Sequence, residues 1–173
     1  MGTAGLSPQL DLGRIGAVVV AGGKSTRMGK VDKIFASLRG KALITHVLDV
    51  FCRCDFIDDL VLVLDKTNFD QGWKLLEEYG WSDSVKICPG GPRRQDSVRE
   101  GLRNLARCEW VVIHDGARPC IDVAMIERGL AEARNGGAAV AAVPAQETIK
   151  MVGKDGLVEK TPPRQSLWIA QTP

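Results

Sequence analysis

The sequence predicts an α/β fold: a Rossmann-like, mostly parallel sheet with helices on both faces. Continuous apolar runs rich in β-branched residues are typical of strands that are buried on both faces. Amphipathic helical stretches lie between these runs, and steady alternation of strand and helix is typical of a parallel sheet. Such sheets bind ligands beyond the carboxyl ends of their strands, so we expect functional residues in the loops that follow the apolar runs.

The expected strands are short apolar runs bounded by polar or glycine-rich segments. The first, at residues 15–20, leads directly into Ala-Gly-Gly. Residues 60–64 and 110–113 repeat the pattern, residues 85–88 form a shorter run, and residues 138–143 form a version built from smaller side chains. We therefore predict five strands in this order along the chain.

The expected helices lie between the strands and place apolar residues on one face at helical spacing. The three predicted faces are Leu43, Val47, Leu48 and Phe51; Val98, Leu102 and Leu105; and Ile126, Leu130 and Ala133. Asp122 precedes the third helix as a plausible N-cap.

The alternation stops after Val143, where polar residues, glycines and prolines predominate. We predict that residues 144–166 form a protruding β-hairpin arm that turns at Lys154-Asp155-Gly156. Residues 167–170 resemble a strand that returns to the core. We expect residues 1–173 to form a single domain that ends just as this strand returns.

Composition excludes several broad classes of protein. The chain of 173 residues has 23 Lys and Arg against 21 Asp and Glu, which gives no general footprint for nucleic acid. No apolar run approaches the roughly 20 residues of a membrane span, so we expect no membrane segment. Five cysteines without regular spacing favour a reduced, cytoplasmic chain over a disulfide framework. Cys52-Arg53-Cys54 is too closely spaced for the usual zinc knuckle.

A glycine-rich loop follows the first strand and reads Ala21-Gly22-Gly23-Lys24-Ser25-Thr26-Arg27-Met28. Glycines let the backbone approach a triphosphate, and successive N–H groups bind anions. Its spacing excludes both a P-loop and a dinucleotide fingerprint. The alternative is an ordinary turn with solvated basic residues; its place after the first buried strand favours phosphate.

Two further clusters follow predicted strands. Residues 90–98, Gly-Gly-Pro-Arg-Arg-Gln-Asp-Ser-Val, open a helix, where backbone amides can face an anion. The alternative is a capped helix with solvated arginines. Residues 114–119, His-Asp-Gly-Ala-Arg-Pro, place Asp115 at the end of a strand, where a carboxylate can bind Mg²⁺ or a substrate hydroxyl. A structural turn with an Asp115–Arg118 pair is the competing interpretation, and His114 is more typical of a packed residue than of a base.

A fourth cluster makes a resemblance specific. It comprises Glu147-Thr148-Ile149-Lys150, Thr161-Pro162-Pro163-Arg164 and Leu167-Trp168-Ile169-Ala170-Gln171-Thr172-Pro173. The four clusters, in this order, resemble the 2-C-methyl-D-erythritol 4-phosphate cytidylyltransferases of the non-mevalonate isoprenoid pathway. The resemblance covers residues 17–173, nearly the whole chain.

The resemblance implies transfer of CMP from CTP to the acceptor phosphate, with Mg²⁺ bridging the phosphates of CTP. Arg27 and Lys33 match the catalytic cations that steady the triphosphate. The positions that match the CTP site are Ala21, Gly22, Gly23, Gly91, Ser97 and Asp115. Those that match the acceptor site are Asp115, Arg118, Thr148 and Arg164. The last two lie on the arm, which in the family crosses to a partner subunit, so the resemblance implies a homodimer.

Several positions depart from the family pattern. Asp32 and Ile34 make the first loop similar to that of the molybdenum-cofactor guanylyltransferases, while Pro92, Gly116 and Glu147 replace common family residues. The family segment beyond Gln-Thr-Pro, with its second catalytic lysine, is absent. Two alternatives therefore stand beside the cytidylyltransferase: an enzyme for ribitol phosphate or another polyol phosphate, and an inactive nucleotide-binding remnant.

Overall fold

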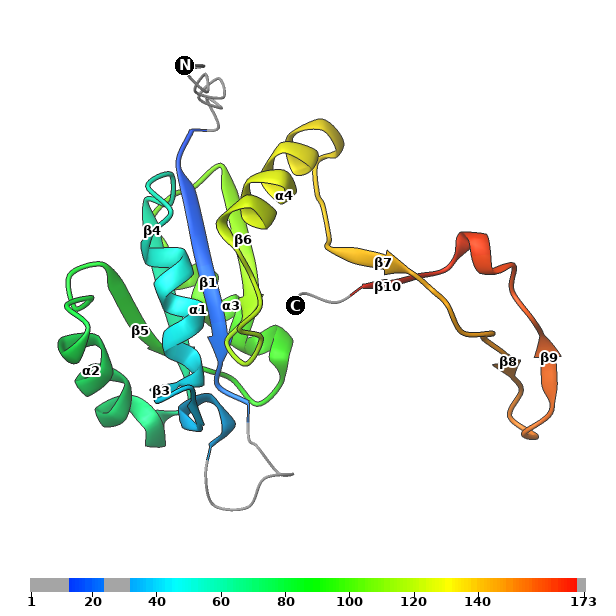
Figure 1. The fold of residues 1–173 in the computed structure, drawn as a ribbon, viewed down its shortest axis with the longest axis horizontal. Coiled ribbons are helices and arrows are strands. Elements are labelled where there is room, and N and C mark those ends of the chain that lie inside the picture. The colour runs from blue at the N-terminus through cyan, green and yellow to red at the C-terminus, as the bar shows by residue number, and fades with distance from the viewer. Residues whose placement is uncertain (1–12, 24–31, 171–173) are drawn as a thin grey trace.

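A computed structural model describes residues 13–23 and 32–170. Its centre is a four-stranded parallel sheet in the order β5-β4-β1-β6. The strands are β1 (Ile15–Ala21), β4 (Asp59–Leu64), β5 (Val85–Pro89) and β6 (Trp110–Asp115). The predicted α/β class and four of the five predicted strands are confirmed, and β1 lies in the middle of the sheet with a partner on each side (Figure 1).

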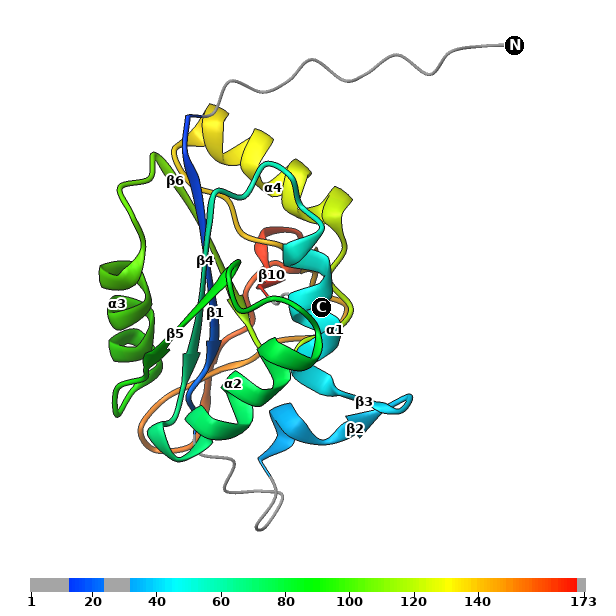
Figure 2. The same cartoon turned by 90° about the vertical axis from the view of Figure 1, so that its left-hand side faces the viewer.

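The central strands are apolar on both faces because helices cover both (Figure 2). Strand side chains alternate between faces, so Ala17 and Val19 join the larger buried cluster while Val18 joins the smaller one. On one face lie α1 (Leu43–Cys52), α2 (Phe69–Glu78) and α4 (Val123–Gly136); α3 (Arg94–Asn104) lies alone on the other.

The helices differ in how well the sequence predicts them. The predicted faces of α1 and α4 are confirmed, and the Asp122 carboxylate caps α4 by accepting a hydrogen bond from Met125 N at 2.7 Å. The sequence pattern did not predict α2. It buries only Gly72, Leu75 and Leu76, too narrow a stripe to stand out.

The predicted face of α3 is only partly confirmed: Val98 is half-buried and Leu105 packs against the smaller buried cluster. Leu102 is exposed, and the buried residues of this helix are Asp96, Ser97 and Gly101. A Cβ on Gly101 would overlap the Val18 side chain and lie 3.0 Å from Val63 Cγ2. The helix backbone therefore lies directly on the sheet, and this close approach replaces the large apolar side chains that the sequence pattern suggested.

Residues beyond α4 leave the central sheet. β7 (Ala142–Pro144) pairs with β10 (Trp168–Ala170) in a separate antiparallel pair, so the prediction of a core strand at residues 138–143 is wrong. The arm is confirmed: β8 (Met151–Val152) and β9 (Val158–Lys160) form a hairpin that projects away from the core (Figure 1). Its turn lies where predicted, with Gly156 at φ 80° and the Asp155 carboxylate accepting a hydrogen bond from Leu157 N.

Two further findings concern membrane-spanning helices and the cysteines. No helix in the described part of the chain is long and apolar enough to cross a membrane. The cysteines Cys52, Cys54, Cys88, Cys108 and Cys120 are all free.

Candidate functional site

The carboxyl edge of the sheet brings two glycine-rich segments together. Gly22 follows β1 and Gly90 follows β5, although β4 separates these two strands in the sheet. A Cβ on Gly22 would lie 3.3 Å from Gly90 Cα, so backbone faces backbone at this point. Gly90 N donates to Leu64 O at 2.8 Å and fixes the second segment to the end of β4. Glycine suits so close an approach, and an edge lined by backbone atoms suits an anionic or planar ligand.

Gly91 and Ser97 form the wall of this edge at the start of α3. Ser97 Oγ lies 3.1 Å from Gly91 N, which donates to it, and Ser97 is buried. A Cβ on Gly91 would overlap the side chain of Asp96. Ala21, Gly22, Gly91 and Ser97, all predicted from the sequence, therefore lie close to one another.

Asp115 reaches the same edge at the end of β6. Its neighbour across the sheet is Val20, and Gly116 N donates to Val20 O at 2.8 Å. A Cβ on Gly116 would lie 2.9 Å from the Ala21 Cβ, so the turn after β6 packs against the start of the first glycine loop. Arg118 N closes that turn by donating to Asp115 O at 3.1 Å.

Two guanidinium groups hold the Asp115 carboxylate. Arg94 Nη2 and Nε lie 2.7 and 3.0 Å from Oδ1, and Arg118 Nε lies 3.4 Å from Oδ2. The Asp115–Arg118 pair weighed as a structural alternative is therefore present. Arg94, which was not among the predicted site residues, makes the shorter contact.

His114 is a buried, neutral support for this turn. Its Nε2 lies 2.9 Å from Arg118 O, and because a carbonyl only accepts, Nε2 carries the proton. Burial lowers the pKa of this imidazole, and the ring packs against Phe51 with centroids 5.7 Å apart. Within the described residues Nδ1 has no hydrogen-bond partner. The packed role that the sequence favoured for His114 is what the geometry provides.

The predicted catalytic cations are only partly described. Arg27 lies outside the described residues, as does the loop from Lys24 onward. Lys33 begins a short 3₁₀ turn and is exposed. The preceding residue, Asp32, accepts a hydrogen bond from Asn68 Nδ2 at 2.7 Å, which ties this turn to the segment after β4. Gly23 has open space around it, with no atom within 4 Å of a Cβ built there.

The arm residues lie apart from this edge within one chain. Thr148 and Arg164 are both exposed, and Arg164 Nη1 donates to Gln146 O at 3.0 Å. The arm extends sideways from the core, away from the carboxyl ends of β1 and β6 (Figure 1). The structure thus brings together the predicted nucleotide residues and Asp115, but not Thr148 or Arg164.

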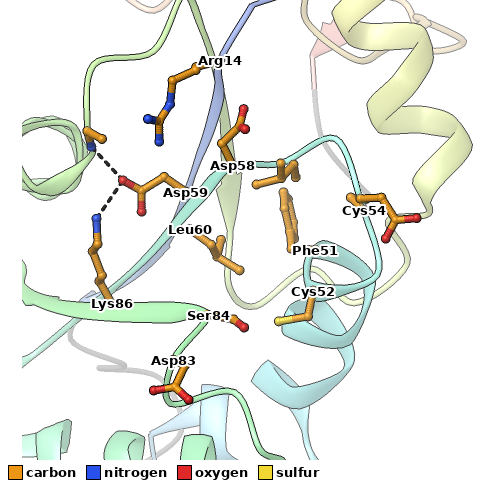
Figure 3. A pocket seen from close by; sticks show the side chains of 13 residues that line it. Arg14, Phe51, Cys52, Cys54, Asp58, Asp59, Leu60, Asp83, Ser84 and Lys86 are labelled. Atoms are coloured by element: carbon orange, nitrogen blue, oxygen red, sulfur yellow. Dashed lines mark hydrogen bonds and ion pairs between the residues drawn. The ribbon is translucent and has the colours of Figure 1, made fainter. Parts of the chain in front are cut away.

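A pocket of about 490 Å³ lies at the opposite, amino edge of the sheet (Figure 3). Its buried Asp59 accepts hydrogen bonds from Lys86 Nζ at 2.8 Å and Ala106 N at 2.7 Å. Burial alone would raise the pKa of this carboxyl, but those two bonds and the nearby positive charges outweigh burial and lower it. These contacts join β4, β5 and the end of α3, so the pocket's polar groups serve the fold.

The sequence as a whole matches the family model for 2-C-methyl-D-erythritol 4-phosphate cytidylyltransferase over residues 15–173. The chain belongs to this family. A cytidylyltransferase of this name from Dehalococcoides mccartyi is 50% identical over 160 residues, which cover 92% of this chain and 70% of that protein. One from Clostridium perfringens is 39% identical, with 94% and 72% covered.

A solved structure supports the same assignment. The 4-diphosphocytidyl-2C-methyl-D-erythritol synthase of Anaerococcus prevotii superposes with a TM-score of 0.81 at 26% identity, covering 94% of this chain and 70% of that one. As a member of the cytidylyltransferase family, the chain is a nucleotidyltransferase, and the clustered glycines at the carboxyl edge are where such an enzyme needs them.

Proposed function

We propose that this cytidylyltransferase transfers CMP from CTP to 2-C-methyl-D-erythritol 4-phosphate and releases pyrophosphate, a step of isoprenoid biosynthesis. The observation that carries the proposal is the meeting of Gly22, Gly91, Ser97 and Asp115 at one edge of the sheet. Backbone amides there can face CTP, and a carboxylate beside them can accept a hydroxyl hydrogen bond.

The reaction needs positioning and cationic charge. An oxygen of the acceptor phosphate attacks the α-phosphorus of CTP, and the bond from that phosphorus to the bridging oxygen of pyrophosphate breaks. No covalent enzyme intermediate forms, so alignment of the reactants and stabilisation of developing charge supply most of the rate. Arg27 and Lys33 are the cations that we assign to the triphosphate and the α-phosphorus.

CTP is assigned to the glycine-lined edge, with Ala21, Gly22, Gly23, Gly91 and Ser97 around it. Gly22 lies close to Gly90, and the buried Ser97 hydroxyl accepts a hydrogen bond from Gly91 N beside them. Asp115 lies next to Ala21 through Gly116, which suits a contact with the ribose or with the acceptor.

The acceptor is assigned to Asp115 and Arg118 together with Thr148 and Arg164 of the arm. Within one chain the arm points away from the carboxyl edge, so a partner's arm is the simplest source of the last two residues. The arm exposes Met151, Val152 and Val158, apolar side chains that a homodimer would cover. We therefore propose a homodimer whose active sites are shared.

Mg²⁺ is assigned to the phosphates of CTP, where it would offset their charge. No group of three or more His, Cys, Asp or Glu side chains in the described part of the chain could hold a metal ion by itself. Asp115 already contacts two guanidinium groups, which fits a metal held mainly by the nucleotide. The free cysteines suit the reducing cytoplasm, where we place the enzyme.

Pyrophosphate release tests the function directly. The purified chain is supplied with Mg²⁺, CTP and either 2-C-methyl-D-erythritol 4-phosphate or ribitol 5-phosphate, and with GTP in place of CTP as a control. We expect release with CTP and the methylerythritol phosphate only. Release that depends on ribitol 5-phosphate would change the acceptor, and no release with any pair would refute the proposal.

A further inference from the structure

The contact between Arg94 and Asp115 joins two parts of the site that are distant in sequence. Arg94 is the first residue of α3, and Asp115 is the last residue of β6. Nη2 and Nε of Arg94 both donate to Oδ1, at 2.7 and 3.0 Å. The glycine wall at the start of α3 is thereby linked to the carboxylate at the end of β6.

Helix stability does not explain Arg94. The amino end of a helix carries partial positive charge, so a cation in the first turn is disfavoured. Its neighbour Arg93 is paired within the same helix, with Nε 2.8 Å from Asp96 Oδ2. Arg94 instead reaches a carboxylate outside the helix, and its side chain is 61% exposed. An ion pair this exposed adds little to folding, so the contact needs another reason.

That reason lies in the charge of the ligands. CTP and the acceptor phosphate are both strongly anionic, and an unpaired carboxylate beside them would repel them. Arg94 on Oδ1 and Arg118 on Oδ2 offset Asp115 and leave one net positive charge among the three groups. Each carboxylate oxygen accepts more than one hydrogen bond, so Asp115 can still receive a substrate hydroxyl while it is held.

We propose that Arg94 is a positioning residue of the reaction: it fixes the Asp115 carboxylate for a substrate hydroxyl and offsets the negative charge of that carboxylate beside the anionic ligands. The inference rests on the proposed function, since it takes Asp115 as a substrate contact. Arg94 acts through Asp115, and this gives a sharp prediction for paired substitutions.

The test is a double-mutant cycle of Arg94→Gln and Asp115→Asn. Two quantities are measured: kcat/KM for the acceptor, and the acceptor's dissociation constant by calorimetry with a non-reactive CTP analogue, which also reports on variants without turnover. Arg94→Gln should lower kcat/KM about 10-fold and weaken acceptor binding by a similar factor, as expected for a lost hydrogen bond between charged groups. In the Asp115→Asn background it should change either quantity less than about 2-fold.

Two further variants separate positioning from a structural role. Arg94→Lys keeps the charge without the guanidinium fork and should recover part of the loss. Arg103→Gln removes a cation from the same helix that pairs only locally with Glu100 at 2.8 Å, and it should match the unaltered chain. Thermal unfolding of each variant checks that the fold is kept.

The outcomes are distinct. Equal effects of Arg94→Gln in both backgrounds, or no effect in the unaltered background, would overturn the role of Arg94. An unaltered chain that releases no pyrophosphate would instead count against the proposed function, while the cycle on acceptor binding would still report on Arg94.

Discussion

The close seat of α3 on the sheet predicts that Gly101→Ala destabilises the protein. A Cβ at this position would overlap Val18 Cγ1 and lie 3.0 Å from Val63 Cγ2. Both valines are wholly buried, and Val18 is in the middle strand, so neither backbone can move aside without disturbing the sheet. Valine is branched at Cβ, which restricts its χ1 angle, so the side chain has little freedom to turn away.

Two opposing effects set the magnitude. Replacing glycine with alanine inside a helix stabilises it by about 1 kcal/mol through helix propensity. Adding a carbon to a filled core costs about 1–3 kcal/mol. Because the overlap is with rigid, buried atoms, we expect the upper part of that range and a net loss of about 1–2 kcal/mol in the free energy of unfolding. In a chain of this size each kcal/mol lowers Tm by roughly 2–4 °C.

Gly129→Ala is the matched control. Gly129 lies within α4, is exposed, and has no atom within 4 Å of a Cβ built there. The same substitution should therefore raise the free energy of unfolding, by about 0.5–1 kcal/mol.

Urea unfolding at pH 7 measures the free energy of unfolding of both variants, and an unchanged m-value shows that the two values can be compared. Ser97, which we assign to the CTP site, lies on the same helix as Gly101. Gly101→Ala should therefore also weaken CTP binding, whereas Gly129→Ala should leave CTP binding unchanged. If Gly101→Ala stabilised the chain as much as Gly129→Ala does, α3 would not lie directly on β1 and β4, and the packing argument would fail.

Three further predictions concern the site and the amino edge. Arg27→Ala should lower turnover in the pyrophosphate assay by about 100-fold or more, as for a lost transition-state contact; a drop of only a few-fold would remove the catalytic role from the loop. Arg164→Ala should raise the KM for the acceptor and spare CTP binding measured by calorimetry, and an effect confined to CTP would contradict the role of the arm. Asp59→Asn should cost about 1–2 kcal/mol at pH 7. The folded-state pKa of Asp59 is lowered, so its contribution is full above the unfolded pKa and is lost as the pH falls through the folded value. The free energy of unfolding of Asp59→Asn should therefore fall less between pH 7 and pH 3 than that of the unaltered chain. Urea unfolding over this pH range measures both, and an equal fall in the two proteins would contradict the stabilising role of the Asp59 carboxylate.

The central strands could be predicted because their burial on both faces leaves a run of apolar, β-branched residues. The strand predicted at residues 138–143 lacked such a run. Alanine and glycine dominate it, and its last residues pair with β10 outside the central sheet. When the strand propensity of a segment is low, tertiary contacts decide which strand it pairs with, and the local sequence pattern does not show those contacts.

α3 shows a second limit of periodicity. Val98, Leu102 and Leu105 mark a helical face, yet the helix turns Gly101 and Ser97 to the sheet because the backbones lie so close. Hydrophobic spacing assumes that large side chains fill the space between layers, and at Gly101 the layers lie too close for one. The exposed Leu102 is the visible result.

The candidate site divides in the same way. The clusters that contain Gly22, Gly91 and Asp115 could be foreseen because each follows a strand at one edge, and the family resemblance picked out these residues and Ser97 within them. Arg94 could not, since nothing in the sequence links it to a carboxylate 21 residues away. Its one signal was a cation at the start of a helix, where positive charge is disfavoured. In the proposed homodimer, Thr148 and Arg164 would reach Asp115 through an arrangement between chains, which no local pattern records.

The slender attachment of the arm has a consequence for how such enzymes diversify. The arm leaves the core through β7 and rejoins it through β10, and Ala145 N donates to Leu167 O at 3.0 Å to close its base. Both hairpin strands are exposed and contribute nothing to either buried cluster. In the proposed function, the arm's contacts to the acceptor and the buried core thus lie in separate segments. Under that proposal, substitutions in the hairpin could alter the acceptor without removing side chains from the buried core.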